Sequence, residues 1–228
     1  MARLLNLDHL PYTEALALMR ELIQAKQREL LPEVLILVEH DPVLTLGYRA
    51  RFDDILIPEK TLHARNIDVH RVERGGLVTY HGPGQLLAYP IFNLRNLKLG
   101  VARFINLLEE VIISTLRDFG LEAGRKENLP GVWVRKEKIA SIGVAVRRWI
   151  TFHGLALNYD PELSHFELIN PCGMTGVKMT SIARLLGSPV SPTRLRNQMI
   201  HHFERLFNLD FSPWSLPLAQ EAGRRYEP

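Results

Sequence analysis

The 228-residue chain contains one cysteine, and this scarcity excludes several kinds of site. A single thiol cannot form an intramolecular disulfide, a Cys-x-x-Cys redox pair, or a zinc or iron–sulfur centre held by several thiolates. We therefore expect a reducing environment and no bound metal. Long apolar runs are also missing, since the longest, such as VLILV at 34–38, have the length of a strand and not that of a membrane helix. We expect a soluble, cytoplasmic protein.

The chain has little excess charge of either sign. Its 28 Lys and Arg residues against 25 Asp and Glu residues give a net charge of +3. The arginines and aromatic residues are dispersed, whereas a nucleic-acid surface needs a basic stripe interleaved with aromatic residues. The charge predicts no nucleic-acid partner and is compatible with an acidic protein partner. The hydrophobic fraction of 46% is that of an ordinary globular protein and excludes extensive disorder.

Hydrophobic periodicity predicts a mixture of helices and strands. Helical spacing covers 12–30, 101–119, 180–186 and 192–207, the last beginning at Ser191-Pro192. Strand-like runs cover 34–39, 43–46, 67–72, 86–92, 132–134, 138–146 and 150–158. We expect the first two strands to pair with each other and the last three to form a β-meander. Because regular βαβ alternation is absent, the order indicates one α+β domain over 1–211, a mixed sheet covered by helices, with a loosely packed tail over 212–228.

Cys172 lies in the segment Asn170-Pro171-Cys172-Gly173, where proline and glycine favour an irregular backbone. A thiol outside regular structure can serve as a nucleophile if a nearby base or cation lowers its pKa. The alternative is an inert, buried cysteine, which is the commoner role of a lone thiol.

Lys138 is the candidate partner of Cys172. It begins the apolar segment Lys138-Ile139-Ala140, and Arg135 and Lys136 precede it. Apolar surroundings and neighbouring cations both disfavour the charged form of an amine, which would make the lysine a better base. The alternative is a solvated lysine at the end of a strand, and spacing in the sequence does not pair the two residues.

The segment 74–85 combines four glycines and a proline with the polar residues Arg74, Thr79, Tyr80 and His81. Glycine permits close approach of the backbone to a ligand. The spacing fits neither a Walker loop nor a dinucleotide-binding fingerprint, so a loop between strands is the alternative. The histidines predict no metal site: His201-His202 lacks ligand spacing, and we expect His153 to be a hydrogen-bonded core residue.

Four ordered motifs resemble the lipoyl(octanoyl) transferase family: RGGLVTYHGPGQL at 74–86, KIASIG at 138–143, FHGLALN at 152–158 and NPCG at 170–173. The resemblance implies the fold of the biotin and lipoate protein ligases. It also implies transfer of octanoyl from the phosphopantetheine of acyl carrier protein to a lysine of lipoyl domains, in the 2-oxoacid dehydrogenase complexes and the glycine cleavage H protein. We expect a monomer without a bound cofactor.

The resemblance assigns roles to individual residues. Cys172 would carry the acyl group as a thioester, and Lys138 would lower the pKa of that thiol and relay protons. The segments implied to bind the acyl substrate comprise Arg74, Gly75, Gly76, Leu77, Val78, Thr79, Tyr80, His81, Ser141, Ile142, Gly143, Gly154, Leu155 and Ala156. Leu77, Ile142 and Leu155 are candidates to line an apolar tunnel. Arg147 and Arg148 are candidates for docking acyl carrier protein near the mouth of the site.

Three other functions are compatible with parts of this pattern. An ATP-dependent lipoate or biotin ligase would use the same fold without a cysteine. An amidotransferase would pass octanoyl between two lipoyl-type proteins and differ only in its donor. A binding module for lipoyl domains or nucleic acid would tolerate the loss of Cys172 and Lys138, whereas an enzyme would not.

Overall fold

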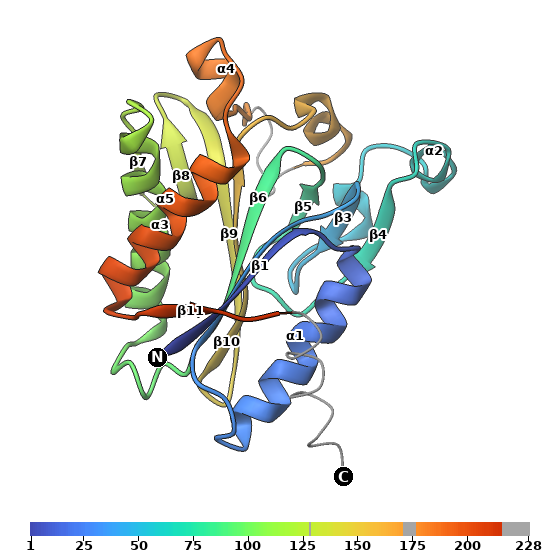
Figure 1. Ribbon diagram of the computed structural model, residues 1–228. Coiled ribbons are helices and arrows are strands. Elements are labelled where there is room, and N and C mark those ends of the chain that lie inside the picture. Colours follow the sequence, from blue (N-terminus) through green and yellow to red (C-terminus); the bar gives the residue numbers. More distant parts are fainter. Residues whose placement is uncertain (128, 171–176, 216–228) are drawn as a thin grey trace.

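The computed structural model describes residues 1–127, 129–170 and 177–215, in which helices pack on both faces of a large sheet and a smaller sheet stands beside it (Figure 1). The helices are α1 (Tyr12–Gln27), α2 (Glu59–Ala64), α3 (Val101–Asp118), α4 (Ile182–Leu186) and α5 (Pro192–Phe207). The strands are β1 (Ala2–His9), β2 (Val34–Glu39), β3 (Val43–Leu46), β4 (Asp68–Arg71), β5 (Val78–His81), β6 (Gln85–Ile91), β7 (Gly124–Lys126), β8 (Leu129–Val134), β9 (Glu137–Arg147), β10 (Ile150–Asn158) and β11 (Phe211–Pro213).

The large sheet is mixed and has the order β11-β1-β2-β6-β10-β9-β8-β7. Strand β1 runs parallel to both of its neighbours, and the other pairs are antiparallel. The predicted meander is confirmed, since β8, β9 and β10 are consecutive antiparallel neighbours. The resulting α+β architecture is the one that the sequence predicted.

Alternate residues of β2 enter two separate cores. Leu35 and Leu37 pack into the core beneath α3 and α5, and Val34, Ile36 and Val38 pack into the core beneath α1. Successive strand side chains point to opposite faces, so a strand covered by helices on both faces is apolar throughout. This double burial explains the continuous apolar run of the sequence.

The predicted pairing of 34–39 with 43–46 is wrong. Strand β2 lies in the large sheet, whereas β3 joins the three-stranded sheet of order β4-β3-β5. The break at Asp41-Pro42 redirects the chain to a second sheet, because proline cannot continue a ladder of hydrogen bonds. Part of the segment 74–85, which was expected to be mostly loop, forms strand β5.

The ends of the chain contain elements that periodicity did not predict. Strand β1 lies inside the large sheet, and β11 pairs with it from Ala2↔Phe211 to Leu4↔Pro213. The boundary expected at 211/212 therefore falls within β11, and residues 216–228 lie outside the described residues. The division into a domain and a tail stays a prediction. Helix α5 begins as expected, with the Ser191 side chain accepting from the amide of Arg194 and Pro192 in the first turn.

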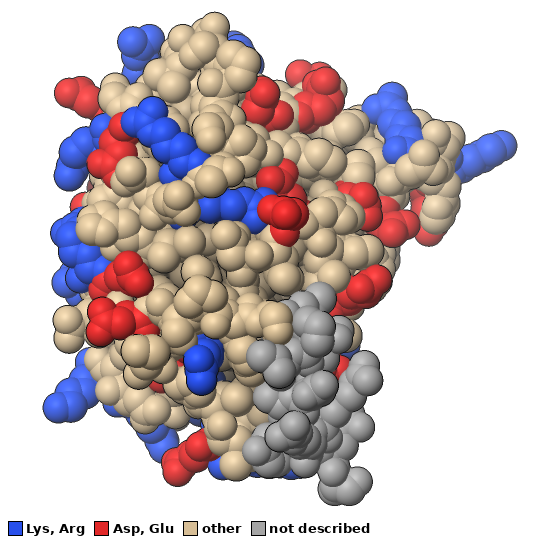
Figure 2. Space-filling view, viewed as in Figure 1, with Lys and Arg blue, Asp and Glu red and all other residues tan. Residues whose placement is uncertain are grey.

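The surface carries mixed charge. On the face shown in Figure 2, Lys and Arg side chains are interspersed with Asp and Glu, and no continuous basic stripe crosses the coloured residues. None of the helices in the described residues is long and apolar enough to cross a membrane.

Candidate active site

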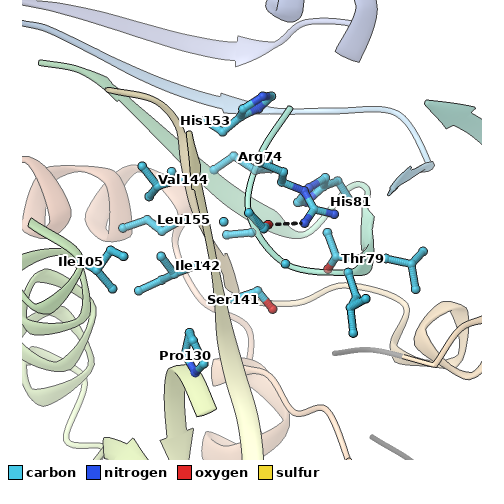
Figure 3. A pocket seen from close by; sticks show the side chains of 18 of the residues that line it. Arg74, Thr79, His81, Ile105, Pro130, Ser141, Ile142, Val144, His153 and Leu155 are labelled. Atoms are coloured by element: carbon cyan, nitrogen blue, oxygen red, sulfur yellow. Dashed lines mark hydrogen bonds between the residues drawn. The ribbon is translucent and has the colours of Figure 1, made fainter. Parts of the chain in front are cut away.

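A cavity of about 320 Å³ lies between the Arg74–His81 segment and strands β9 and β10. It brings together the predicted substrate-binding residues Arg74, Gly75, Gly76, Leu77, Val78, Thr79, His81, Ser141, Ile142, Gly143, Gly154, Leu155 and Ala156, together with Lys138. Figure 3 shows apolar side chains in the middle of the cavity, with His153 at one end and Pro130 at the other. Three motifs separated in the sequence therefore form one concave site of the size usual for small ligands.

The pairing of β9 with β10 sets the register of the cavity wall. Gly154 pairs with Gly143, and Leu155 pairs with Ile142. A Cβ at Gly154 would lie 2.1 Å from the carbonyl oxygen of Ala88 on β6. Glycine is therefore required for the close approach of β10 to β6, whereas the β9–β10 pairing places Leu155 and Ile142 side by side in the wall.

The Arg74 side chain ties the small sheet to the cavity. Its guanidinium donates from Nη2 to the carbonyl oxygen of Thr45 at 2.6 Å and to Thr45 Oγ1 at 2.8 Å. Nη1 donates to the carbonyl oxygen of Gly75 at 3.0 Å, and the Gly75 amide donates to Val144 on β9 at 2.9 Å. Because the arginine is 6% exposed, these charge-assisted bonds hold the Arg74-Gly75 segment against both sheets.

A series of buried hydrogen bonds links His81 to the backbone at Lys138. His81 Nδ1 donates to Gln85 Oε1 at 3.2 Å, and Gln85 Nε2 donates to Asn158 Oδ1 at 2.9 Å. Asn158 Nδ2 then donates to the carbonyl oxygen of Thr180, whose own amide donates to Lys138. Gln85 and Asn158 belong to the motifs at 74–86 and 152–158, but only the structure shows that they connect His81 to the backbone at Lys138.

Lys138 lies inside the protein and not at a solvated strand end. Its exposed fraction is 2%, and its Nζ lies 5.7 Å from the centre of the Trp133 ring. A Cβ at Gly131 would approach Lys138 Cε to 2.7 Å, so glycine leaves room for the lysine. The neighbours Arg135 and Lys136 are exposed.

Cys172 lies outside the described residues. On one side the described chain ends at Asn170, whose amide donates to the carbonyl oxygen of Asp54 at 2.8 Å. On the other side it resumes at Val177, and the carbonyl oxygen of Lys178 accepts from the Lys138 amide at 2.8 Å. The chain that follows the cysteine motif therefore pairs with β9 at the candidate lysine.

Three other expected residues lie elsewhere. Tyr80 does not line the cavity, because its hydroxyl bonds to His165 Nδ1 at 2.8 Å and its ring packs against Phe166. Arg147 lies nine residues from Lys138 along β9, about 30 Å at the usual rise of a strand. Arg147 is therefore far from the lysine end of the cavity, and the docking of acyl carrier protein at Arg147 and Arg148 stays a prediction.

The histidines outside the cavity form no metal centre. His202 Nε2 lies 2.7 Å from Asp118 Oδ2 on α3, and His201 is exposed. No group of three or more potential ligands is arranged to hold a metal ion within residues 1–127, 129–170 and 177–215.

Comparisons with known proteins match this chain over most of its length. Residues 11–204 match the model of the lipoyl protein ligase A/B catalytic domain. An octanoyltransferase of Syntrophobacter fumaroxidans is 43% identical over 95% of this chain and 95% of its own length. An octanoyltransferase of Caldanaerobacter subterraneus is 43% identical over 91% of this chain and 90% of its own length.

Among solved structures, lipoate-protein ligase A bound with ATP superimposes with a TM-score of 0.79 and 18% identity, over 98% of this chain and 93% of that one. At this identity the likeness concerns the fold alone. It confirms the predicted catalytic fold of the biotin and lipoate protein ligases.

Proposed function

Since the chain belongs to the lipoyl protein ligase A/B catalytic family and is an octanoyltransferase of protein lipoylation, we propose that it takes its octanoyl group from acyl carrier protein and passes it on through Cys172. The donor is the octanoyl thioester of the phosphopantetheine arm. The acceptor is a lysine amine of a lipoyl domain, in the 2-oxoacid dehydrogenase complexes and the glycine cleavage H protein. The enzyme needs no bound cofactor, because both half-reactions start from a thioester.

The reaction proceeds in two acyl transfers. Lys138 Nζ takes the proton of the Cys172 thiol, and the thiolate attacks the thioester carbonyl of the donor. The C–S bond to phosphopantetheine breaks, the departing thiolate takes the proton back, and the octanoyl group is left on Cys172. The acceptor amine then attacks this second thioester. An amide forms, the Cys172 sulfur leaves, and the proton lost by the amine passes through Lys138 back to sulfur.

The cavity that joins Lys138 to an apolar wall is the observation that carries this proposal. Lys138 is buried and lines the cavity. Ile142, Leu155 and Ile105 lie in its middle (Figure 3). Such a wall suits an unbranched acyl chain. The pairing of Lys178 and Thr180 with Lys138 returns the chain that carries Cys172 to the lysine, which supports a pair of Cys172 and Lys138.

Intact-protein mass spectrometry tests the acyl-enzyme directly. After mixing with octanoyl-acyl carrier protein, wild type should gain one octanoyl group that hydroxylamine removes. Cys172→Ser should gain no such adduct, and Lys138→Met should gain it at least about a hundredfold more slowly, as expected for loss of a general base. Lys136→Met is the matched control, because this lysine is exposed and lies only two residues away.

The same experiment separates the proposal from the ligase and amidotransferase alternatives. If wild type stays unmodified by the acyl carrier protein thioester but makes octanoyl-adenylate from ATP and free octanoate, the ligase function holds instead. If only an octanoylated lipoyl protein serves as donor, the enzyme is an amidotransferase. Normal labelling of Lys138→Met would remove the lysine from the mechanism.

A further inference from the structure

Aromatic and imidazole rings gather at the end of the cavity opposite Lys138. Tyr12, Tyr89, His81 and His153 all line the cavity, and His153 pairs with Val144, six residues from Lys138 along β9. The Tyr12 ring stacks 6.3 Å from that of His81, and the Tyr89 ring meets that of His153 edge-on at 6.4 Å. A cavity for a purely apolar chain has no need of four polar rings, so this end calls for a separate explanation.

Two polar atoms in this ring cluster have no hydrogen-bond partner within the described residues: Tyr12 Oη and His153 Nε2. Tyr12 is 5% exposed and His153 is 2% exposed. The neighbouring Tyr89 hydroxyl shows the ordinary arrangement, since it lies 2.9 Å from His40 Nε2. Buried polar groups are almost always paired with protein, water or ligand, so two orphans at one cavity end indicate a missing polar partner.

The backbone of His153 gives an independent indication. Its φ is 53°, in the left-handed region that residues other than glycine rarely adopt, and it lies in the middle of β10. Such a conformation costs about 1–3 kcal/mol and persists where the surrounding structure imposes it, commonly at functional sites. The strand thus holds the imidazole at the cavity in an unfavourable conformation.

Both groups are uncharged near neutral pH. Burial, with smaller contributions from Arg74 and Arg20, lowers the pKa of His153 to about 3. Burial raises the pKa of Tyr12 to about 12. A neutral imidazole and a neutral phenol together offer hydrogen-bond donors and acceptors to a neutral dipole.

The spacing along the strands relates this ring cluster to an acyl chain. His153 pairs with Val144, and Ser141 lies three residues back along β9 toward Lys138. That interval is about 10 Å at the usual strand rise, comparable with an extended eight-carbon chain. Figure 3 shows Ile142, Val144 and Leu155 between Ser141 and His153. A chain whose carbonyl lies beside Ser141, between Lys138 and the rings, therefore places its last carbons at the rings.

We propose that Tyr12 Oη and His153 Nε2 form a polar floor of the acyl cavity that binds a neutral polar end group and resists apolar chains longer than octanoyl. The inference rests on the proposed function, because it takes the acyl carbonyl to lie beside Ser141, on the Lys138 side of the cavity. An apolar chain that reaches the floor keeps both polar atoms unpaired and displaces any water from them. A chain of the same length that ends in a hydroxyl pairs with them instead.

Two isosteric acyl groups test the floor in the wild-type enzyme. Nonanoyl and 8-hydroxyoctanoyl differ only in a terminal methyl group against a hydroxyl, and each is supplied as its acyl carrier protein thioester. We expect kcat/KM to be about tenfold higher for 8-hydroxyoctanoyl, because pairing a buried polar group is worth about that factor. An apolar floor would reverse the order, and equal or better use of nonanoyl would overturn the proposal.

Tyr12→Phe removes one polar atom of the floor and adds no volume. It should reduce the preference for 8-hydroxyoctanoyl from about tenfold to about threefold, since one of two partners is lost. Tyr80→Phe is the matched control, because the Tyr80 hydroxyl is also buried but bonds to His165 outside the cavity. It should retain the wild-type ratio.

The outcomes for the floor and for the function are distinct. If Tyr12→Phe keeps the wild-type ratio while octanoyl is transferred normally, the floor is wrong and the proposed function stands. If wild type transfers none of the three acyl groups from acyl carrier protein, the proposed function fails and the floor fails with it.

Discussion

Acidification should destabilise this protein well above the pH at which ordinary carboxylates titrate, because imidazoles are buried in neutral form. Burial lowers the pKa of His153 to about 3 and that of His40 to about 4, from a usual value of 6.5. It also lowers the pKa of His81 well below that value. Between pH 6.5 and about pH 4 the unfolded chain therefore binds protons that the folded chain does not.

The sign and size of the effect follow from proton linkage. More protons bound by the unfolded state means that the free energy of unfolding falls as pH falls. Between pH 7 and pH 5, each imidazole with a usual pKa unfolded and a pKa of 4 or less folded removes about 2 kcal/mol. His40 and His153 together remove about 4 kcal/mol, and His81 acts in the same direction.

Urea unfolding followed by tryptophan fluorescence at pH 7 and pH 5, at constant ionic strength, measures the loss. The His153→Asn variant should lose about 2 kcal/mol less than wild type over this interval. Asparagine is chosen because it tolerates the left-handed backbone at this position. The control His63→Asn, at an exposed position of α2, should lose as much as wild type. An equal loss in wild type and His153→Asn would refute the reasoning.

Two substitutions around the cavity give further predictions. Gly131 has a φ of 122°, and a Cβ there would lie 2.5 Å from the Ala140 carbonyl oxygen. Gly131→Ala should therefore cost about 1–3 kcal/mol in urea unfolding and slow acyl-enzyme formation by displacing Lys138, whereas Gly124→Ala, in open space on β7, should do neither. Arg74→Lys keeps the charge but loses the forked bonds to Thr45, and should lower the free energy of unfolding by about 2 kcal/mol. An unchanged free energy of unfolding would contradict a stabilising role of the Arg74 hydrogen bonds.

The sequence predicted those helices and strands whose boundaries are set by residues within them. Helix α5 follows its Ser191-Pro192 start and its apolar spacing, and the β8-β9-β10 meander follows short strands joined by charged turns. Sequence patterns did not predict which strands pair when the partner strand lies far away in the chain. The separation of β2 and β3 into different sheets depends on which distant strands cover their edges, and β1 is in the sheet because β2 and β11 flank it.

The cavity shows the same division. The sequence alone pointed to the family through ordered motifs, and so named 14 of the 23 residues of the cavity wall. The other nine come mostly from outside the segments that the motifs assigned to the substrate. The sequence did not show that the Tyr80 side chain faces Phe166, since neighbouring residues of a strand point to opposite sides. The pair of Cys172 and Lys138 stays a prediction, because the cysteine lies outside the described residues.

The sequence by itself determined the class of fold and, through the four ordered motifs, the octanoyltransferase family. Only the tertiary structure decided how far Arg147 lies from the lysine end, and that Gln85 and Asn158 connect His81 to the backbone at Lys138. It also brought Tyr12 and His153 into the wall of one cavity. Hydrogen bonds and burial are relations between segments far apart in the chain, so no local pattern records them.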